Sequence, residues 1–338
     1  MSDTPGHHIR HGEHTSGARP PVRDRTRREG DAVTSTDPPS LPGWHAGASG
    51  AGSDVPAGPV PSVRAGLRSL LSPTGLTGGL TELAWVGAHA LLYPLGTRTE
   101  RLRPDGRYRP GAQAPGVRAL FADDPLAARI PVVLVHGLVD NRSVFAVMRR
   151  SLRRRGFAQV CSWNYSPFLR DVESAAAALG AHVERVCQST GHDRVHVVGH
   201  SLGGLVARYL VQRLDGDRRI DSLVTLGTPH AGTLWAHLLP TGLVGQLRPG
   251  SPLIRELAEP APACRTRITA VYSNLDQLLV PSAVGRCEHP DLRARNVLVR
   301  GVGHMSLPIH RAVVAEVAAT LAGRRTTVDA PPTETAVA

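Results

Sequence analysis

The sequence predicts an α/β fold, in which helices flank a mostly parallel central sheet and a small insertion forms a lid or cap. Short runs rich in Val, Ile and Leu alternate with helical patterns between about residues 115 and 322, as in parallel sheets that are buried on both faces. One of these runs leads directly into Gly-x-Ser-x-Gly at residues 199–203. Polar residues that can carry chemistry follow the ends of other runs, where the carboxyl ends of parallel strands meet.

The first predicted strand covers residues 130–135, which read Ile-Pro-Val-Val-Leu-Val. It leads into His136-Gly137-Leu138. The glycine lets the loop turn, so that the next backbone N–H can face a reacting group. The amide of Leu138 is therefore our first candidate to bind an oxyanion.

The most informative segment is residues 194–204, where a β-branched run enters Gly-His-Ser-Leu-Gly-Gly and then a helical pattern. This is the sequence of a nucleophile elbow, in which a strained turn from strand to helix holds out the serine. We predict Ser201 as the nucleophile. The amide of Leu202, at the first turn of the following helix, is the second candidate oxyanion donor because it is unpaired within the helix.

An acid and a base follow in the order Ser, Asp, His. Asp276 comes just after a predicted strand at 267–273, and His304 lies in a glycine-rich turn after a predicted strand at 296–300. A helical pattern then runs from about 308 to 321. In such a set the histidine takes the serine proton and the aspartate stabilises the resulting imidazolium.

Alternatives to this acid and base remain open at the sequence level. Asp291 is a second candidate for the acid, if the strand boundary is misread. The histidines that compete with His304 are His230, His289 and His310. Although His136 and His200 lie beside the reacting groups, we expect their side chains to orient the backbone by hydrogen bonds and not to transfer protons.

These motifs resemble those of the bacterial lipases of the α/β-hydrolase superfamily. The resemblance rests on residues 136–138, 199–204, 226–233 and 303–304, and covers roughly residues 115–322. Its most specific part is Gly-Thr-Pro-His-Ala-Gly-Thr, which is typical of triacylglycerol lipases and related esterases. The resemblance implies hydrolysis of carboxylic esters through an acyl-serine intermediate, with lipid or other acyl esters as substrates.

Two other functions compete with ester hydrolysis. An acyltransferase would use the same triad and resolve the acyl-enzyme with an alcohol in place of water. A non-catalytic lipid-binding protein could use the same scaffold, because fold alone does not fix chemistry. The intact order of the triad argues against the second alternative.

The chain divides into four predicted regions. Residues 1–62 are rich in Gly, Pro, Ser, His and Arg and are expected to be disordered. Residues 63–114 contain an amphipathic helix and an irregular connection, and residues 115–322 form the catalytic domain. Within it, residues 231–263 lack regular alternation and are interpreted as the apolar lid. Residues 323–338 are expected to form a disordered tail.

Composition limits the partners of the chain. The formal net charge of its 338 residues is +11 with no lysine, and aromatic residues make up 4%. Scattered arginines and few aromatic side chains do not favour nucleic acid. The amphipathic segment at 76–95, or the lid, is a candidate for peripheral membrane contact. We expect no cofactor and no metal site.

Cysteine usage and the N-terminus bear on localisation. A disulfide between Cys264 and Cys287 is an open hypothesis for an oxidising compartment, whereas Cys161 and Cys187 are expected to be buried thiols. The first thirty residues contain no apolar signal region. The sequence as written therefore favours a cytoplasmic or peripheral membrane location, and export would require a start site near Val63.

Overall fold

The structure is a computed structural model in which the following residues are described: 119–121, 124, 126–138, 140–165, 171–238 and 242–324. The predicted disordered segment at 1–62 and the predicted amphipathic helix at 76–95 lie outside the described residues, as does the predicted tail from residue 325 onward. Most of the predicted catalytic domain lies within the described residues.

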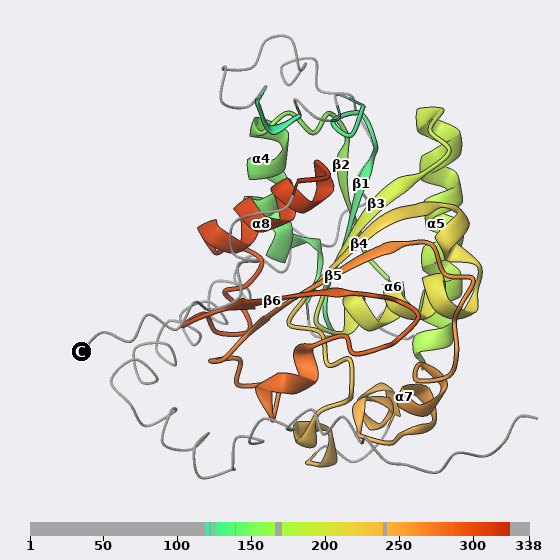
Figure 1. Ribbon diagram of the computed structural model, residues 1–338, viewed down its shortest axis with the longest axis vertical. Helices are drawn as coiled ribbons and strands as arrows, with labels where there is room; N and C mark the ends of the chain where they lie inside the picture. The colour runs from blue at the N-terminus through green and yellow to red at the C-terminus, as the bar shows by residue number, and fades with distance from the viewer. Residues whose placement is uncertain are drawn as a thin grey trace, which may run out of the picture. The chain divides into compact units, whose positions relative to one another are not determined.

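A six-stranded sheet forms the centre of the described residues (Figure 1). Its strands are β1 (Val132–Val135), β2 (Val160–Trp163), β3 (Val195–His200), β4 (Ile220–Leu226), β5 (Arg267–Ser273) and β6 (Arg295–Val299). Their order is β2-β1-β3-β4-β5-β6, and each neighbouring pair is parallel. The predicted α/β class is confirmed, and this sheet is parallel throughout.

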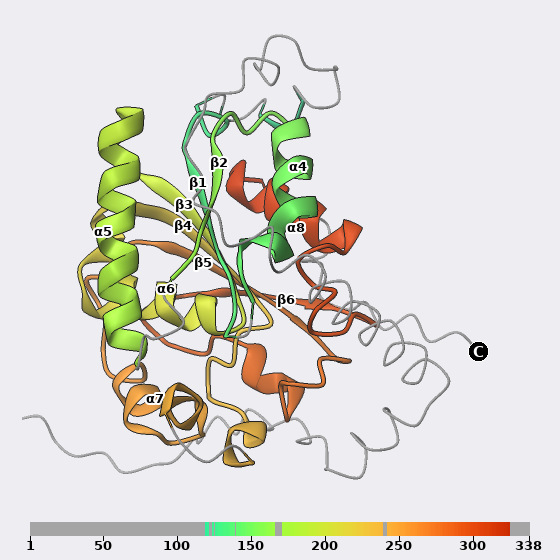
Figure 2. The ribbon, with the colours of Figure 1, turned by 180° about the vertical axis from the view of Figure 1, so that it is seen from behind.

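Helices cover both faces of the sheet (Figures 1 and 2). The α-helices are α4 (Ala146–Arg154), α5 (Val172–Thr190), α6 (Leu202–Arg213), α7 (Pro252–Glu256) and α8 (Arg311–Leu321). Short 3-10 helices are η3 (Arg142–Phe145), η4 (Gly216–Arg218), η5 (Leu234–His237), η6 (Gly242–Leu247) and η7 (Ser282–Gly285). Helices α5 and α6 pack on one face, and α4 and α8 pack on the other.

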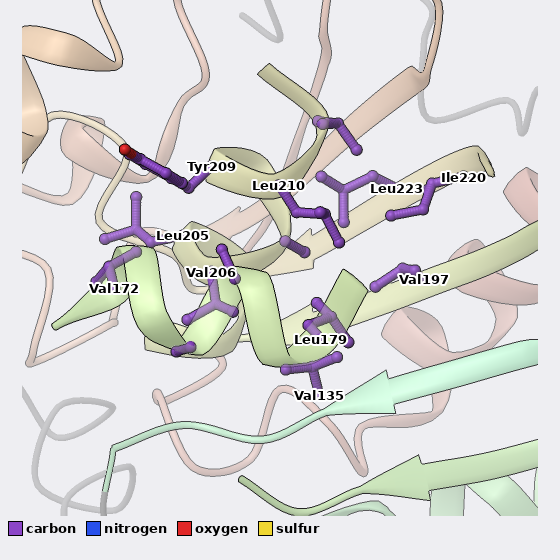
Figure 3. Packing of buried hydrophobic residues seen from close by; sticks show 14 of the residues in the cluster. Val135, Val172, Leu179, Val197, Leu205, Val206, Tyr209, Leu210, Ile220 and Leu223 are labelled. Carbon is purple, nitrogen blue, oxygen red and sulfur yellow. The ribbon is translucent and has the colours of Figure 1, made fainter. Parts of the chain in front are cut away.

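The core consists of two layers, one on each side of the sheet. Val133 and Val135 of β1 belong to the layer under α5 and α6, which Figure 3 shows in close view. Val132 and Leu134 belong to the layer under α4 and α8. Because side chains alternate between the faces of a strand and both faces are covered, β1 needs apolar residues at every position. This explains its unbroken apolar sequence.

The order of the strands brings two loops together. From β1 the chain crosses through α4 to β2 at one edge of the sheet, then returns to β3 on the other side of β1 and continues toward β6. The connections that follow β1 and β3 therefore lead to opposite sides of the sheet. Ligands in open α/β sheets bind at the position where the strand order reverses in this way. Val135 at the end of β1 pairs with Gly199 near the end of β3. The loop after β1 consequently starts beside the serine turn.

The region from 231 to 263 contains η5, η6 and α7 but no strand among its described residues. The predicted lapse of strand and helix alternation is thus present. Its role as a lid stays a prediction. No described helix has the combination of length and hydropathy needed to span a membrane.

All four cysteines are free thiols in the structure. The disulfide hypothesis for Cys264 and Cys287 is therefore wrong for this structure. Both thiols are at least partly buried, and burial raises the pKa of each. Cys161 and Cys187 are buried thiols, as predicted.

Candidate active site

Ser201 occupies a strained turn between β3 and α6, with φ 52° and ψ −123°. A positive φ in a residue with a side chain costs on the order of 1–3 kcal/mol, so its surroundings must hold it. The Ser201 N–H donates to the carbonyl of Leu226 at 2.8 Å, and Thr228 Oγ1 donates to the carbonyl of Ser201 at 2.9 Å. A Cβ on Gly199 would lie 2.6 Å from Cα of Gly204, and a Cβ on Gly204 would collide with the Thr228 side chain, which explains why these two positions are glycines. The elbow is thus fixed by backbone contacts on both sides.

Asp276 and His304 form a buried pair. The Nδ1 atom of His304 lies 2.9 Å from Asp276 Oδ1 and 2.8 Å from Asp276 Oδ2. Oδ1 also accepts hydrogen bonds from the backbone N–H groups of Leu278 at 3.0 Å and Leu279 at 3.1 Å. A carboxylate accepts hydrogen bonds, so Nδ1 carries a proton and Nε2 is left as the basic nitrogen.

Gly227, just after β4, gives this pair its space. It adopts φ +55°, and a Cβ there would lie 2.9 Å from Asp276 Oδ2 and 3.1 Å from His304 Nδ1. Its neighbour Thr228 is the residue that bonds to Ser201. One short turn after β4 therefore touches both the acid–base pair and the serine elbow.

The two candidate oxyanion donors flank Ser201. Leu202 is the first residue of α6, where an N–H has no partner inside the helix. On the other side, a Cβ on Gly137 would lie 3.2 Å from Cβ of Ser201. Leu138 follows directly, so its peptide belongs to the loop that passes the serine. The structure thus places Leu202 and the Gly137 backbone beside Ser201, and the oxyanion role of the Leu138 and Leu202 amides stays a prediction.

Two aromatic side chains hold the loop after β1. His136 Nδ1 donates to the carbonyl of Gly137 at 2.8 Å, and the Tyr165 hydroxyl donates to the same oxygen at 2.7 Å. Their rings are stacked with centroids 4.3 Å apart. Burial lowers the pKa of His136 and raises the pKa of Tyr165, so both groups are neutral near pH 7. His136 thus orients backbone, as expected from the sequence.

The alternative acid and bases have other partners. Asp291 accepts a hydrogen bond from the Ala261 N–H at 2.7 Å. His289 Nε2 donates to the carbonyl of Glu259 at 2.9 Å, and His310 is an exposed residue at the start of α8. Asp276, and not Asp291, therefore contacts His304.

Sequence reasoning gave no role to Arg208, which is buried in α6. Its guanidinium donates to the carbonyls of His230 at 3.0 Å and Leu257 at 2.8 Å, and to Gln212 Oε1 at 2.6 Å. Burial lowers the pKa of His230 well below its usual value, so that imidazole is neutral beside the arginine. Arg208 thereby ties α6 to the segment after β4 and to the residue after α7. No pattern in the sequence distinguishes this arginine from the exposed ones.

Exposed apolar side chains lie in the loops at the carboxyl edge of the sheet. We call this set the apolar edge, and its members are Leu138, Leu234, Trp235, Leu238 and Leu278. Two contacts join the loop after β4 to the loop after β5: Thr233 Oγ1 donates to the carbonyl of Leu278 at 2.7 Å, and the Leu234 N–H donates to the carbonyl of Val280 at 3.1 Å. Leu238 is 68% exposed and Leu278 is 47% exposed.

The described residues contain no group of three or more His, Cys, Asp or Glu side chains able to hold a metal ion. The chemistry that the elbow and the acid–base pair can supply is nucleophilic attack with proton transfer.

Known proteins resemble parts of this chain in sequence. The family model for palmitoyl protein thioesterase matches residues 131–277, less than half of the chain. A triacylglycerol lipase from Burkholderia plantarii is 34% identical over 140 residues, which are 37% of this chain and 38% of that protein. A second one, from Pseudarthrobacter phenanthrenivorans, is 34% identical over 137 residues, 36% of this chain and 42% of that protein. Over this part of its length the chain is therefore similar to triacylglycerol lipases. It spans about two fifths of the length of these curated relatives.

Solved structures share the fold of this chain. Aspergillus fumigatus lipase B superposes with a TM-score of 0.54 at 16% identity, covering 70% of this chain and 67% of the other. Bacillus licheniformis lipase BlEst2 in its mature form superposes with a TM-score of 0.50 at 18% identity, covering 59% and 93%. At these sequence identities the structural similarity shows a shared fold and nothing about function.

Proposed function

We propose that this chain hydrolyses carboxylic esters of acyl chains through an acyl-serine intermediate. The observation that carries the proposal is the contact between His304 Nδ1 and the Asp276 carboxylate, with the ring of His304 next to that of His200, the residue before Ser201. These groups come from the ends of β3, β5 and β6, and a general base oriented by a buried carboxylate beside an elbow serine is the arrangement of serine hydrolases.

The reaction follows from this arrangement. His304 Nε2 takes the proton of Ser201 as its Oγ attacks the ester carbonyl, and the Asp276 carboxylate stabilises the imidazolium. The Leu138 and Leu202 amides bind the oxyanion of the tetrahedral intermediate, and one such donor is worth about 3 kcal/mol. His304 then returns the proton to the leaving alcohol. Water, activated by the same imidazole, hydrolyses the acyl-serine and restores the free serine.

The apolar edge supports an acyl chain as the part of the substrate that is recognised. Burial of an acyl chain contributes about 0.8 kcal/mol of binding free energy for each CH₂ group. Trp235 and Leu238 provide exposed apolar surface against which such a chain can be buried. The names of the similar proteins, triacylglycerol lipase and palmitoyl-protein thioesterase, are those of enzymes that act on acyl esters and thioesters. We propose oxygen esters with apolar acyl chains as the substrate class.

The proposal is tested by hydrolysis of p-nitrophenyl esters of increasing acyl length, with wild type and Ser201→Ala. We expect activity that rises with chain length and is lost in the variant. A fluorophosphonate probe should label wild type and not Ser201→Ala. Hydrolysis that persists in the folded variant would refute the role of Ser201. Wild type that takes the label but releases product only with an added alcohol would identify an acyltransferase.

The role of the apolar edge is tested separately. Leu238→Ser should raise KM for the longest ester several-fold and leave KM for an acetyl ester unchanged. Leu126→Ser is the matched control, because Leu126 is 67% exposed and lies before β1, at the opposite edge of the sheet. Equal changes in both variants would argue against acyl binding at the apolar edge.

A further inference from the structure

His200 lies between two parts of the site that the mechanism uses. It is the last residue of β3, directly before Ser201, and its side chain is fully buried. Its Nε2 atom lies 3.2 Å from the backbone carbonyl oxygen of His304, and the two rings lie 4.8 Å apart, centroid to centroid. A carbonyl only accepts hydrogen bonds, so Nε2 carries the proton and donates it to His304.

The other side of the ring faces Asp140, in the loop after β1. His200 Nδ1 lies 3.3 Å from Asp140 Oδ2, and both side chains are buried. Because Nε2 already carries a proton and a carboxylate only accepts, this contact is an ion pair that requires a second proton on Nδ1. A Cβ on Gly137 would lie 3.1 Å from that oxygen and 3.6 Å from Nδ1, so a glycine leaves the space in which the two groups meet. One imidazole therefore contacts both the loop of the oxyanion donor and the backbone of the proposed base.

His304 needs such an anchor because of the turn that carries it. Residues 301–303 read Gly-Val-Gly, and Gly301 adopts φ +73°. Glycines lower the energy of alternative backbone conformations. Asp276 holds the imidazole at Nδ1. The hydrogen bond from His200 to the His304 carbonyl fixes a second point, in the backbone of the turn that carries the imidazole.

We propose that His200, oriented by Asp140, is a positioning residue that holds the His304 backbone and couples it to the loop after β1. The kinetic consequence rests on the proposed hydrolase function. Displacement of a catalytic group by about 1 Å can lower a rate about 100-fold. The expected effect is on kcat, because the ground-state binding of the acyl chain does not involve His200.

Three variants separate the hydrogen bond from simple packing. His200→Phe keeps an aromatic ring and removes the donor, whereas His200→Gln places an amide donor near the position of Nε2. Asp140→Asn keeps the shape of its side chain and removes the charge. We expect His200→Phe to lower kcat by about 10- to 100-fold, with KM changed by less than about twofold. His200→Gln should recover most of kcat, and Asp140→Asn should lie between wild type and His200→Phe.

A second readout does not depend on turnover. The His304 Nδ1 proton, bonded to Asp276, should give a low-field proton NMR signal, identified by its loss in Asp276→Asn. We expect this signal to be lost or broadened in His200→Phe and present in His200→Gln, with circular dichroism showing that each variant is folded. If His200→Phe does not fold, Asp140→Asn and His200→Gln still decide the outcome through kcat and the signal.

Two results would overturn the positioning role. One is a His200→Phe protein that keeps both kcat and the signal. The other is an equal loss in folded His200→Phe and His200→Gln together with an unchanged Asp140→Asn, which would mean that the ring only fills space. If wild type hydrolyses no ester but the signal responds as expected, the proposed function fails and the positioning role stands.

Discussion

Replacing Gly227 by alanine tests the geometry of the acid–base pair. An added Cβ would lie 2.9 Å from Asp276 Oδ2, 3.1 Å from His304 Nδ1 and 2.7 Å from Leu307 Cδ1. The leucine methyl can move, but Asp276 is held by two backbone N–H groups at its other oxygen. The pair must therefore separate or rotate to accommodate the methyl group.

The expected magnitude has two parts. Alanine at φ +55° costs about 1–2 kcal/mol of folding free energy, because its Cβ approaches a carbonyl oxygen. Displacement of the pair by a few tenths of an ångström to 1 Å should lower kcat by up to about 100-fold. Gly191→Ala is the matched control, since Gly191 ends α5 at φ +69° with nothing within 4 Å of an added Cβ.

The assay is hydrolysis of the best p-nitrophenyl ester, together with urea unfolding of both variants. We expect similar losses of stability in the two variants and a loss of kcat in Gly227→Ala alone. Wild-type kcat in a folded Gly227→Ala protein would refute the claim that the acid–base pair occupies this space in the working enzyme. An equal loss of kcat in Gly191→Ala would mean that lower stability, and not geometry, reduces the rate.

The remaining predictions concern the acid, a buried arginine and a buried histidine. Asp276→Asn should lower kcat about 10⁴-fold with little change in KM, because an amide favours the wrong tautomer of His304; near-normal turnover would contradict the pairing. Arg208→Met should lower the free energy of unfolding by about 3 kcal/mol in urea titrations, since it removes the donor to buried carbonyls; an unchanged midpoint would contradict this. Burial lowers the pKa of His196 to about 4, so the unfolded state binds more protons between pH 4 and 6.5. Stability should therefore fall by about 3 kcal/mol as the pH decreases through this range, and the fall should be smaller in His196→Leu.

Local patterns were enough to predict the elements that carry the site. Every residue of β3 is buried, including His196 and His200, because helices cover both faces of the sheet. The small residues around Ser201 are those that a tight strand-to-helix turn requires. The strand predicted at 267–273 has these same bounds in the structure. The positions of strands and tight turns depend on residues that are a few positions apart, so a short stretch of sequence is enough to predict them.

Contacts made by buried polar side chains could not be predicted in the same way. Arg208 has the sequence signature of an ordinary helical arginine, yet it is buried among carbonyl groups from residues 22 and 49 positions away. Asp140 had no recognisable role because its partner His200 comes from another strand. Cys264 and Cys287 are free thiols in the structure, although their positions on either side of β5 had suggested a disulfide.

The sequence by itself determined the parallel α/β class, the serine elbow and the set of side chains from which an acid and a base could be drawn. Only the tertiary structure decided that Asp276 contacts His304, that Gly227 leaves room for the pair, and that His200 bridges Asp140 and His304. The physical reason is that these contacts join the ends of different strands. Their geometry depends on the order of the strands in the sheet, which places β1 beside β3 and β4 beside β5.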